Sequence, residues 1–206
     1  MLDCLPIQIE LGANNMKKWN LLLTETNKAA DRAKREGIPF ILAKLLEARG
    51  IQDTDAFFKE NDILSDPFQM ADMQRAVERI WKAVESFEKI AVYGDYDVDG
   101  VTATAILYEY LESCGANVMF YIPDREDEGY GLNCKALQSL REQDVSLVIT
   151  VDNGISCSQE VEYAKSIGVD VVITDHHQPL DVLPAAVAVV DPHRADCKSA
   201  YKQFSG

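Results

Sequence analysis

Two spacings of apolar residues divide the chain near residue 89. Over 16–88 the apolar residues recur every three to four positions, which is the period of a helix with one buried face. The clearest faces are formed by Ile38, Ile41, Leu42, Leu45 and Leu46, and by Met73, Val77, Ile80, Trp81, Val84 and Phe87. We therefore expect a helical N-terminal segment over 16–88 whose apolar faces pack in a core.

Beyond residue 89, short runs rich in β-branched residues alternate with helical segments. The expected strands are 89–94, 116–122, 145–151, 169–174 and 186–190, and the expected helices are 101–113, 133–142 and 158–166. Runs that are apolar at nearly every position are typical of parallel strands covered on both faces. The pattern predicts an α/β domain with a parallel sheet flanked by helices, preceded by the helical segment.

Four of the expected strands end in side chains that can bind metal. These are Asp95, Asp97 and Asp99, then Asp152, then Asp175, His176 and His177, and finally Asp191 and His193. One acidic strand end means little, because Asp is common in turns. The carboxyl ends of parallel strands meet at one edge of a sheet, where ligands bind, so four such ends predict a shared metal site. Carboxylates with an imidazole suit Mn²⁺ or Mg²⁺ better than zinc.

The segment DYDVDG (95–100) also matches the start of an EF-hand calcium loop. Such a loop needs a Glu at its twelfth position and a helix before it, but this chain has Ile106 there and an expected strand before it. The other interpretation is a strand, a turn and a helix. In it Asp99 caps the helix, Gly100 lets a ligand approach the backbone, and free amides near Val101 and Thr102 face a phosphate.

Two further segments carry candidate chemistry. His176 and His177 are adjacent, and on an extended chain their side chains would point in opposite directions, one to a metal and one to substrate, with Asp175 orienting a ring. The loop IPDREDEGYGL (122–132) is either a solvated loop or one in which Arg125 reaches a substrate phosphate. Both interpretations of the loop stay open.

The amino-acid composition limits the classes of partner that this chain is expected to bind. The net charge is −14, with 34 acidic and 20 basic residues, which argues against a basic surface that binds polyanions. A solvated acidic surface and acid gathered around metal ions both fit this charge. The chain has no apolar run of transmembrane length, no secretion signal, and five scattered cysteines without a CxxC pair. We expect a cytoplasmic protein with no membrane partner.

The segments YGDYDVDGVTATAI, IPDREDEGYGL, ITVDNGIS and VVITDHHQP, in this order, resemble the DHH phosphoesterase superfamily. Within it they resemble the bacterial RecJ group of single-stranded-DNA-specific exonucleases. The resemblance covers 16–206 and implies a DHH domain over 89–206 that is incomplete at its C-terminus, without the C-terminal domains of the family. We expect an N-terminal fragment of low activity. Residues 1–15 are interpreted in one of two ways. They are either a disordered extension or an artefact of the assigned start codon, in which case the protein starts at Met16.

The resemblance also implies a centre of two Mn²⁺ or Mg²⁺ ions that hydrolyses single-stranded DNA from 5′ to 3′ in repair or recombination. The implied metal ligands are Asp95, Asp97, Asp99, Asp152 and His176, with Asp152 bridging both ions and only two of the first three binding directly. Asp152, His176 and His177 would be catalytic. The implied substrate contacts are His177, Arg125, Gly100 and Asn153, and Asp175 would orient a histidine ring. Asp191 stands where such relatives commonly have Asn, so its role stays open.

Two other functions remain possible from the sequence. One is a DHH phosphodiesterase that acts on short oligonucleotides, cyclic dinucleotides or nucleoside bisphosphates, and the other is a catalytically silent replication or repair scaffold. The EGYGL loop and the helical N-terminus favour the nuclease, and dependence on substrate length would separate the two enzymes. A single-stranded-DNA-binding protein or a helicase is a candidate partner through the resemblance alone.

Overall fold

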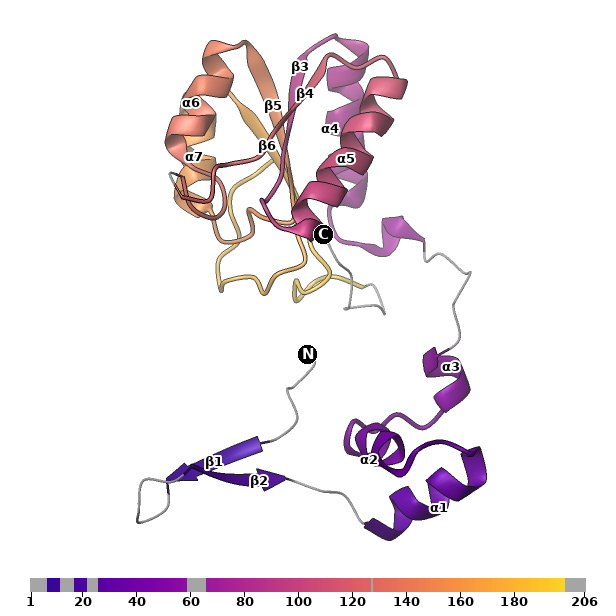
Figure 1. Cartoon of the computed structure of the whole chain (residues 1–206). Helices are drawn as coiled ribbons and strands as arrows, with labels where there is room; N and C mark the ends of the chain where they lie inside the picture. The colour runs from indigo at the N-terminus through magenta and orange to yellow at the C-terminus, as the bar shows by residue number, and fades with distance from the viewer. Residues whose placement is uncertain (1–6, 12–16, 22–25, 59–65, 127, 199–206) are drawn as a thin grey trace. The chain divides into compact units, whose positions relative to one another are not determined.

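The computed structural model describes residues 7–11, 17–21, 26–58, 66–126 and 128–198, which belong to two compact units (Figure 1). The first unit is Met1–Ser65 and the second is Asp66–Gly206. The rest of the expected N-terminal extension, the alternative start at Met16 and the last eight residues lie outside the described residues.

Two short strands occupy part of the chain where an extension and the start of a helix were expected. β1 (Ile7–Leu11) pairs with β2 (Lys17–Leu21) in antiparallel fashion. Apolar residues alternate with polar ones in IQIEL, which is the period of a strand. The prediction of helix from residue 16 is wrong at its start, because β2 occupies Lys17–Leu21, where Trp19 and Leu21 alternate with polar residues.

Three helices complete the first unit. They are α1 (Thr26–Glu36), α2 (Phe40–Ala48) and α3 (Thr54–Phe58). Arg32 of α1 is buried, and its guanidinium donates to the carboxylates of Glu36 and Glu47, which joins α1 to α2. The predicted apolar face of α2 is only partly buried: Leu46 lies in the core, but Ile41 is 66% exposed.

The second unit is built on a five-stranded parallel sheet in the order β4-β3-β5-β6-β7. The strands are β3 (Lys89–Tyr93), β4 (Val118–Tyr121), β5 (Val145–Val151), β6 (Asp170–Thr174) and β7 (Ala188–Val190). Each corresponds to one of the apolar runs. The predicted α/β domain with a parallel sheet is confirmed.

Helices cover both faces of this sheet (Figure 1). After the short helix η1 (Pro67–Gln69), α4 (Met73–Glu85) and α5 (Val98–Ser113) cover one face, and α6 (Cys134–Glu142) and α7 (Ser158–Ser166) cover the other. Along β3, Ile90 and Val92 face the first pair of helices, and Ala91 and Tyr93 face the second. This alternation explains why the strands are apolar at every position. Among the described helices, none has the length and apolar character needed to cross a membrane.

Helix α4 packs on the sheet, although the sequence pattern grouped it with the preceding helical segment. Ala76 and Ala83 are buried in the same core as the sheet residues. The predicted face is therefore only partly correct, because Val77, Trp81 and Phe87 are 41%, 49% and 75% exposed. Small alanine side chains turned toward the strands let the helix approach the sheet closely.

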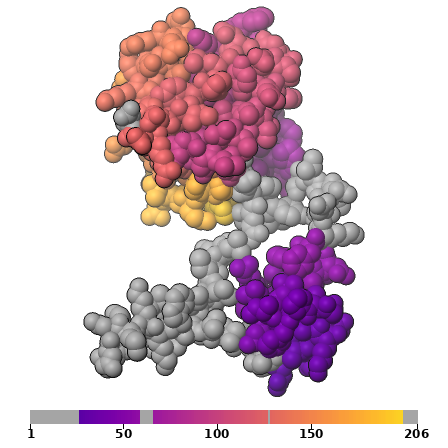
Figure 2. All heavy atoms as spheres, in the orientation of Figure 1, coloured from indigo at the N-terminus to yellow at the C-terminus, as the bar shows by residue number. Residues whose placement is uncertain are grey.

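The order of the strands predicts a ligand site at the carboxyl ends of β3 and β5. The chain passes from β3 to β4 on one side and then returns to β5 on the other side of β3. Ligands bind beyond the carboxyl ends of strands at such a reversal. The segments that follow β6 and β7, coloured yellow, gather at one end of this unit (Figure 2).

Candidate metal centre

Three strand ends bring acidic and histidine side chains together in two sets. β3 leads into Asp95 and Asp97, β5 into Asp152, and β6 into His176 and His177. Among the described residues, Asp95, Asp97 and Asp152 form one set, and Asp152, His176 and His177 form the other. Within each set, one ligand atom per residue lies within 4.8 Å of the others. Asp152 belongs to both sets.

Asp97 sets the turn between β3 and α5. It is the N-cap of α5, and its carboxylate accepts a hydrogen bond from the Gly100 amide at 2.9 Å. This bond lowers the pKa of Asp97, so the carboxylate stays ionised beside other acids. Asp99 does not cap the helix as expected; it lies in the first turn, with one oxygen 3.6 Å from Nε2 of His176. The strand before this turn also excludes an EF-hand.

Gly100 is buried against the backbone of Asp95 and is not open to a ligand. A Cβ atom at position 100 would lie 2.6 Å from the nitrogen of Asp95 and 2.7 Å from its Cα. The Gly100 amide is used by the Asp97 carboxylate, and the Val101 amide by the Asp97 carbonyl. Because the turn uses both amides, the structure gives no support to the expected contact of Gly100 with substrate or to a phosphate on the Val101 amide. Gly100 instead brings Asp95 against the start of α5.

Asp152 is an almost fully buried acidic group of the centre. Its side chain is 2% exposed, and its φ of +62° lies in the left-handed region that non-glycine residues seldom adopt. Oδ1 lies 2.8 Å from Nε2 of His176. Burial, followed by the charges of Asp99 and Asp97, raises the pKa of Asp152 to about 6. A cation bound among these carboxylates would relieve both effects.

The two adjacent histidines share one side of the chain, contrary to the expectation that they point in opposite directions. Their ring centroids are 4.6 Å apart. Oδ1 of Asp175 accepts the amides of His176 and His177 at 2.7 and 3.1 Å, and Oδ2 accepts the amide of Ile155 at 2.9 Å. These bonds bend the chain directly after β6, so the alternation of an extended strand does not apply.

Asp175 also orients the ring of His177. Its Oδ1 lies 2.7 Å from Nδ1 of that ring. Because a carboxylate can only accept, Nδ1 carries the proton in this contact and Nε2 is left as the acceptor. Burial lowers the pKa of His177, but the hydrogen bond and charge of Asp175 outweigh it, so the pKa is raised overall. The side chain of His177 remains 48% exposed, so solutes can reach it.

The donor atoms fit a hard divalent cation. Carboxylate oxygens predominate, and imidazole nitrogens complete the set. Oδ1 of Asp95 is buried and has no hydrogen-bond partner among the described residues. A buried carboxylate oxygen in that state costs free energy unless a cation or water satisfies it. Together with the raised pKa of Asp152, this favours a bound Mn²⁺ or Mg²⁺ ion.

Asn153 supports the site from within the protein. It is fully buried, and its Nδ2 donates to the carbonyls of Tyr93 at 3.2 Å and Val151 at 2.9 Å. The side chain therefore joins the ends of β3 and β5 next to Asp152. A direct contact with substrate, which was expected, is incompatible with this burial.

The loop 122–133 contributes one expected residue and one that was missed. Arg125 is exposed and its guanidinium lies 5.3 Å from the ring centroid of Tyr96, beside the turn that carries Asp97. Tyr130 was not singled out from the sequence, where its one signal is an aromatic residue between two glycines. Its hydroxyl donates to the carbonyl of Asp152 at 3.2 Å.

The fourth strand end does not join either set. Asp191 is fully buried after β7, and its Oδ1 accepts the amide of His193 at 2.6 Å. Oδ2 has no hydrogen-bond partner among the described residues, and burial raises the pKa of Asp191 to about 6. Among the described residues, neither Asp191 nor His193 lies in a set that could hold a metal, so the expected contribution of this strand end to the shared site is not found.

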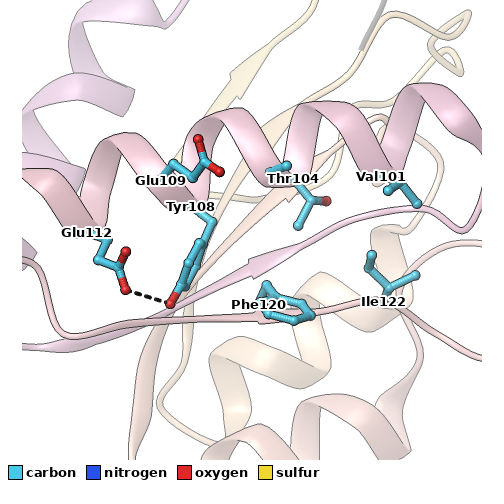
Figure 3. A pocket seen from close by; sticks show the side chains of 8 residues that line it. Val101, Thr104, Tyr108, Glu109, Glu112, Phe120 and Ile122 are labelled. Atoms are coloured by element: carbon cyan, nitrogen blue, oxygen red, sulfur yellow. Dashed lines mark hydrogen bonds between the residues drawn. The ribbon is translucent and has the colours of Figure 1, made fainter.

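Two of the hollows in the second unit differ in whether residues of the candidate metal centre line them. One of about 210 Å³ opens beside the catalytic candidates and is lined by Tyr130, Gly154, Ile155, Ser156, Cys157, Asp175 and His177. The other, of about 340 Å³, lies between α5 and β4 and is lined by Val101, Thr104, Ala105, Tyr108, Glu109, Glu112, Phe120 and Ile122 (Figure 3). In the second, the hydroxyl of Tyr108 donates to Glu112 at 2.9 Å. No residue of the two possible ligand sets lines it, whereas His177 lines the first hollow.

Known proteins resemble this chain in sequence and in fold. Residues 89–204 match the DHH family, N-terminal domain. The chain is 40% identical over 193 residues to the single-stranded-DNA-specific exonuclease RecJ of Bacillus subtilis (strain 168), which covers 92% of this chain and 25% of that protein. The chain therefore spans about a quarter of the length of that relative.

Two solved structures are similar. The crystal structure of exonuclease RecJ bound to manganese is 33% identical with a TM-score of 0.59, over 65% of this chain and 34% of that chain. The structure of RecJ in complex with Mn²⁺ from Thermus thermophilus is 25% identical with a TM-score of 0.58, over 86% of this chain and 25% of that one. Since the family match extends over more than half of the chain and coincides with the sheet that carries the acidic and histidine sets, the chain belongs to the DHH family.

Proposed function

We propose that this chain forms the metal-binding core of a nuclease that hydrolyses phosphodiester bonds of single-stranded DNA from an end. The observation that carries the proposal is the position of Asp152, which is common to both sets of possible ligands. A carboxylate shared by two neighbouring cation sites suits the two-metal centres of phosphatases and nucleases.

We assign two Mn²⁺ or Mg²⁺ ions to the two sets. Asp95 and Asp97 would hold one ion, His176 the other, and Asp152 both. Asp99 lies outside both sets, which supports Asp95 and Asp97 as the direct ligands from the first strand end. Held by these residues, such ions would lower the pKa of a bound water and would stabilise negative charge on the leaving oxygen.

The protein itself orients the groups that meet the substrate. Asp175 holds Nδ1 of His177, so that Nε2 is free to accept a proton and, once protonated, to donate a hydrogen bond to the scissile phosphate. Asn153 keeps the ends of β3 and β5 together, and with them the carboxylates that bind the two ions. Arg125 is exposed beside the acidic turn, where its guanidinium can pair with a backbone phosphate.

The substrate class rests on the relatives. The names of RecJ proteins state specificity for single-stranded DNA, and the likeness to them supports the same substrate here. A net charge of −14 fits a site in which bound cations provide most of the attraction for phosphates. Degradation from 5′ to 3′, a role in repair or recombination, and contact with a single-stranded-DNA-binding protein or a helicase enter the proposal through the family likeness alone.

The test compares mononucleotide release from a long single strand, the matching duplex and a dinucleotide. The single strand carries a label at its 5′ or 3′ end, and the gene product that contains this chain is assayed with Mn²⁺ and with EDTA. Asp152→Ala removes the shared carboxylate, and Asp181→Ala removes an exposed carboxylate outside the centre as a matched control. We expect Mn²⁺-dependent release from the long single strand, at least about 10³-fold slower in Asp152→Ala and unchanged in Asp181→Ala.

Other outcomes redirect the assignment. Preference for the dinucleotide would place the protein with DHH enzymes of short substrates. Silence on all three substrates, with Mn²⁺ binding intact, would favour a scaffold. Equal rates in Mn²⁺ and in EDTA would refute the metal centre itself.

A further inference from the structure

The loop between β4 and α6 is closed by the carboxylate of Glu128. Oε1 of Glu128 accepts hydrogen bonds from the hydroxyl of Tyr121 at 2.6 Å and the side-chain amide of Asn133 at 3.1 Å. Oε2 accepts the amide of Asp124 at 2.9 Å. Tyr121 is the last residue of β4, and Asn133 is the N-cap of α6. A single side chain therefore ties together the two elements that the loop connects.

A second group of contacts fastens the same loop to the sheet. Tyr93 is fully buried at the end of β3, and its hydroxyl donates to the carbonyl of Gly131 at 3.1 Å and accepts from Nδ2 of Asn133 at 3.2 Å. Gly129 and Gly131 have φ of +79° and +85°, the left-handed region that favours glycine. The chain can therefore turn on each side of Tyr130.

The anchored loop places Tyr130 against the metal centre. Its hydroxyl lies 3.2 Å from the carbonyl oxygen of Asp152 and 3.3 Å from Nδ1 of His177. The two rings meet edge to face, with centroids 5.9 Å apart and an interplanar angle of 75°. The hydroxyl donates its proton to the Asp152 carbonyl, and its oxygen faces the protonated Nδ1 of His177. Tyr130 thus contacts both the strand end that carries one ligand and the ring held by Asp175.

We propose that Glu128 and Tyr130 are positioning residues of the centre: Glu128 fixes the loop, and through that loop Tyr130 holds the ring of His177 in its working orientation. The inference rests on the function proposed above and adds two residues to which no role was assigned from the sequence. Among the described residues, neither lies in a set that could hold a metal, so both act through His177.

The hydrogen bonds around position 128 require a carboxylate and not an amide. All three partners of the Glu128 side chain are donors, and a carboxylate offers two oxygens that only accept. Gln at this position would turn an NH₂ group toward one of those donors and leave it unpaired. Glu126 lies on the same loop with an exposed side chain, so Glu126→Gln makes the same change of charge without touching this network.

The first measurement needs no metal and no activity. The chain contains three histidines, so ring ¹⁵N–¹H NMR spectra of the protein in EDTA can be assigned, with His177→Gln identifying the signals of His177. We expect Glu128→Gln and Tyr130→Phe to shift the ring resonances of His177, and Glu126→Gln to leave them in place. Unchanged His177 resonances in both test variants would overturn the proposal.

The second measurement separates positioning from folding and from metal binding. With the single-stranded substrate, we expect kcat of Glu128→Gln and Tyr130→Phe to fall about 10- to 100-fold, with KM and Mn²⁺ affinity within about twofold of the wild type. A parallel loss of Mn²⁺ affinity, or a kcat equal to that of Glu126→Gln, would also overturn it. If the wild type hydrolyses no phosphodiester, the proposed function fails, while the NMR comparison still decides whether the two residues hold the ring.

Discussion

Replacing Asp152 by Asn is expected to stabilise the metal-free protein, although it removes a group central to the proposed chemistry. The side chain of Asp152 is 2% exposed and faces the charges of Asp97 and Asp99. Asn keeps the shape of the side chain and a polar contact to Nε2 of His176, but it carries no charge. The substitution therefore removes electrostatic repulsion without leaving a cavity.

The magnitude follows from the pKa of Asp152. Its rise from 3.8 to about 6 corresponds to about 3 kcal/mol, at about 1.4 kcal/mol per pH unit. Water reaches the side chains of Asp97 and Asp99 and screens their charges, so we expect a net gain of about 1–2 kcal/mol at pH 7. Because the folded-state pKa is the higher one, the penalty is fully present above about pH 6 and disappears as the pH falls toward 3.8.

Urea unfolding of both proteins in EDTA, at pH 7 and at pH 4.5, measures this gain. At pH 7, Asp152→Asn should unfold at a higher urea concentration than the wild type. In thermal unfolding its melting temperature should be about 2–6 °C higher. Both differences should shrink at pH 4.5. Asp181→Asn, a change of the same kind at an exposed position, is the control and should shift neither midpoint.

Added Mn²⁺ should reverse the ranking. A ligand that binds only the folded state stabilises it by RT ln(1 + [L]/Kd), so the wild type should gain stability with Mn²⁺ concentration and Asp152→Asn should gain much less. The reasoning is refuted if Asp152→Asn is no more stable than the wild type in EDTA at pH 7. Equal stabilisation of both proteins by Mn²⁺ would refute the role of Asp152 as a shared ligand.

Three further predictions concern the frame around the centre. Arg194 is 8% exposed and donates to the Asp72 carboxylate at 2.8 Å and to the carbonyl of Val189. Arg194→Met should therefore lower the free energy of unfolding by about 2–3 kcal/mol, and an unchanged urea midpoint would contradict this. Gly100→Ala should lower it by about 2–3 kcal/mol and also weaken Mn²⁺ binding, because the new Cβ would displace Asp95; calorimetry showing wild-type Mn²⁺ affinity would disprove that Gly100 places this ligand. Asp191→Asn should stabilise the metal-free protein by about 1 kcal/mol at pH 7, since burial raises the pKa of Asp191 to about 6, and a gain that stays constant down to pH 4 would rule out that origin.

The spacing of apolar residues was sufficient to predict the strands and helices of the sheet domain. Each of the five apolar runs became a strand, and the helices between them lie within a few residues of the expected bounds. Covering both faces of a parallel sheet requires strands that are apolar throughout, so this pattern has few other solutions. The same rule placed Asp95, Asp152 and His176 at one edge, because parallel strands end on the same side.

Spacing was less informative before the sheet. The strand Lys17–Leu21 was missed, and α4 was grouped with the preceding helices although it packs on the sheet. Which side of α4 is buried depends on the surface that receives it. Close packing on the strands selected Ala76 and Ala83 and left Trp81 half exposed.

The sequence by itself determined the order of strands and helices and the chemistry at the strand ends, because both follow from residues that are neighbours in the chain. Only the tertiary structure decided which of those side chains lie together as possible metal ligands and which ones support them. It placed Asp152 in both ligand sets, buried Gly100 in the turn, and brought Tyr130 to His177. These relations depend on distances between segments tens of residues apart and on bends made by single side chains, and no periodicity along the chain encodes them.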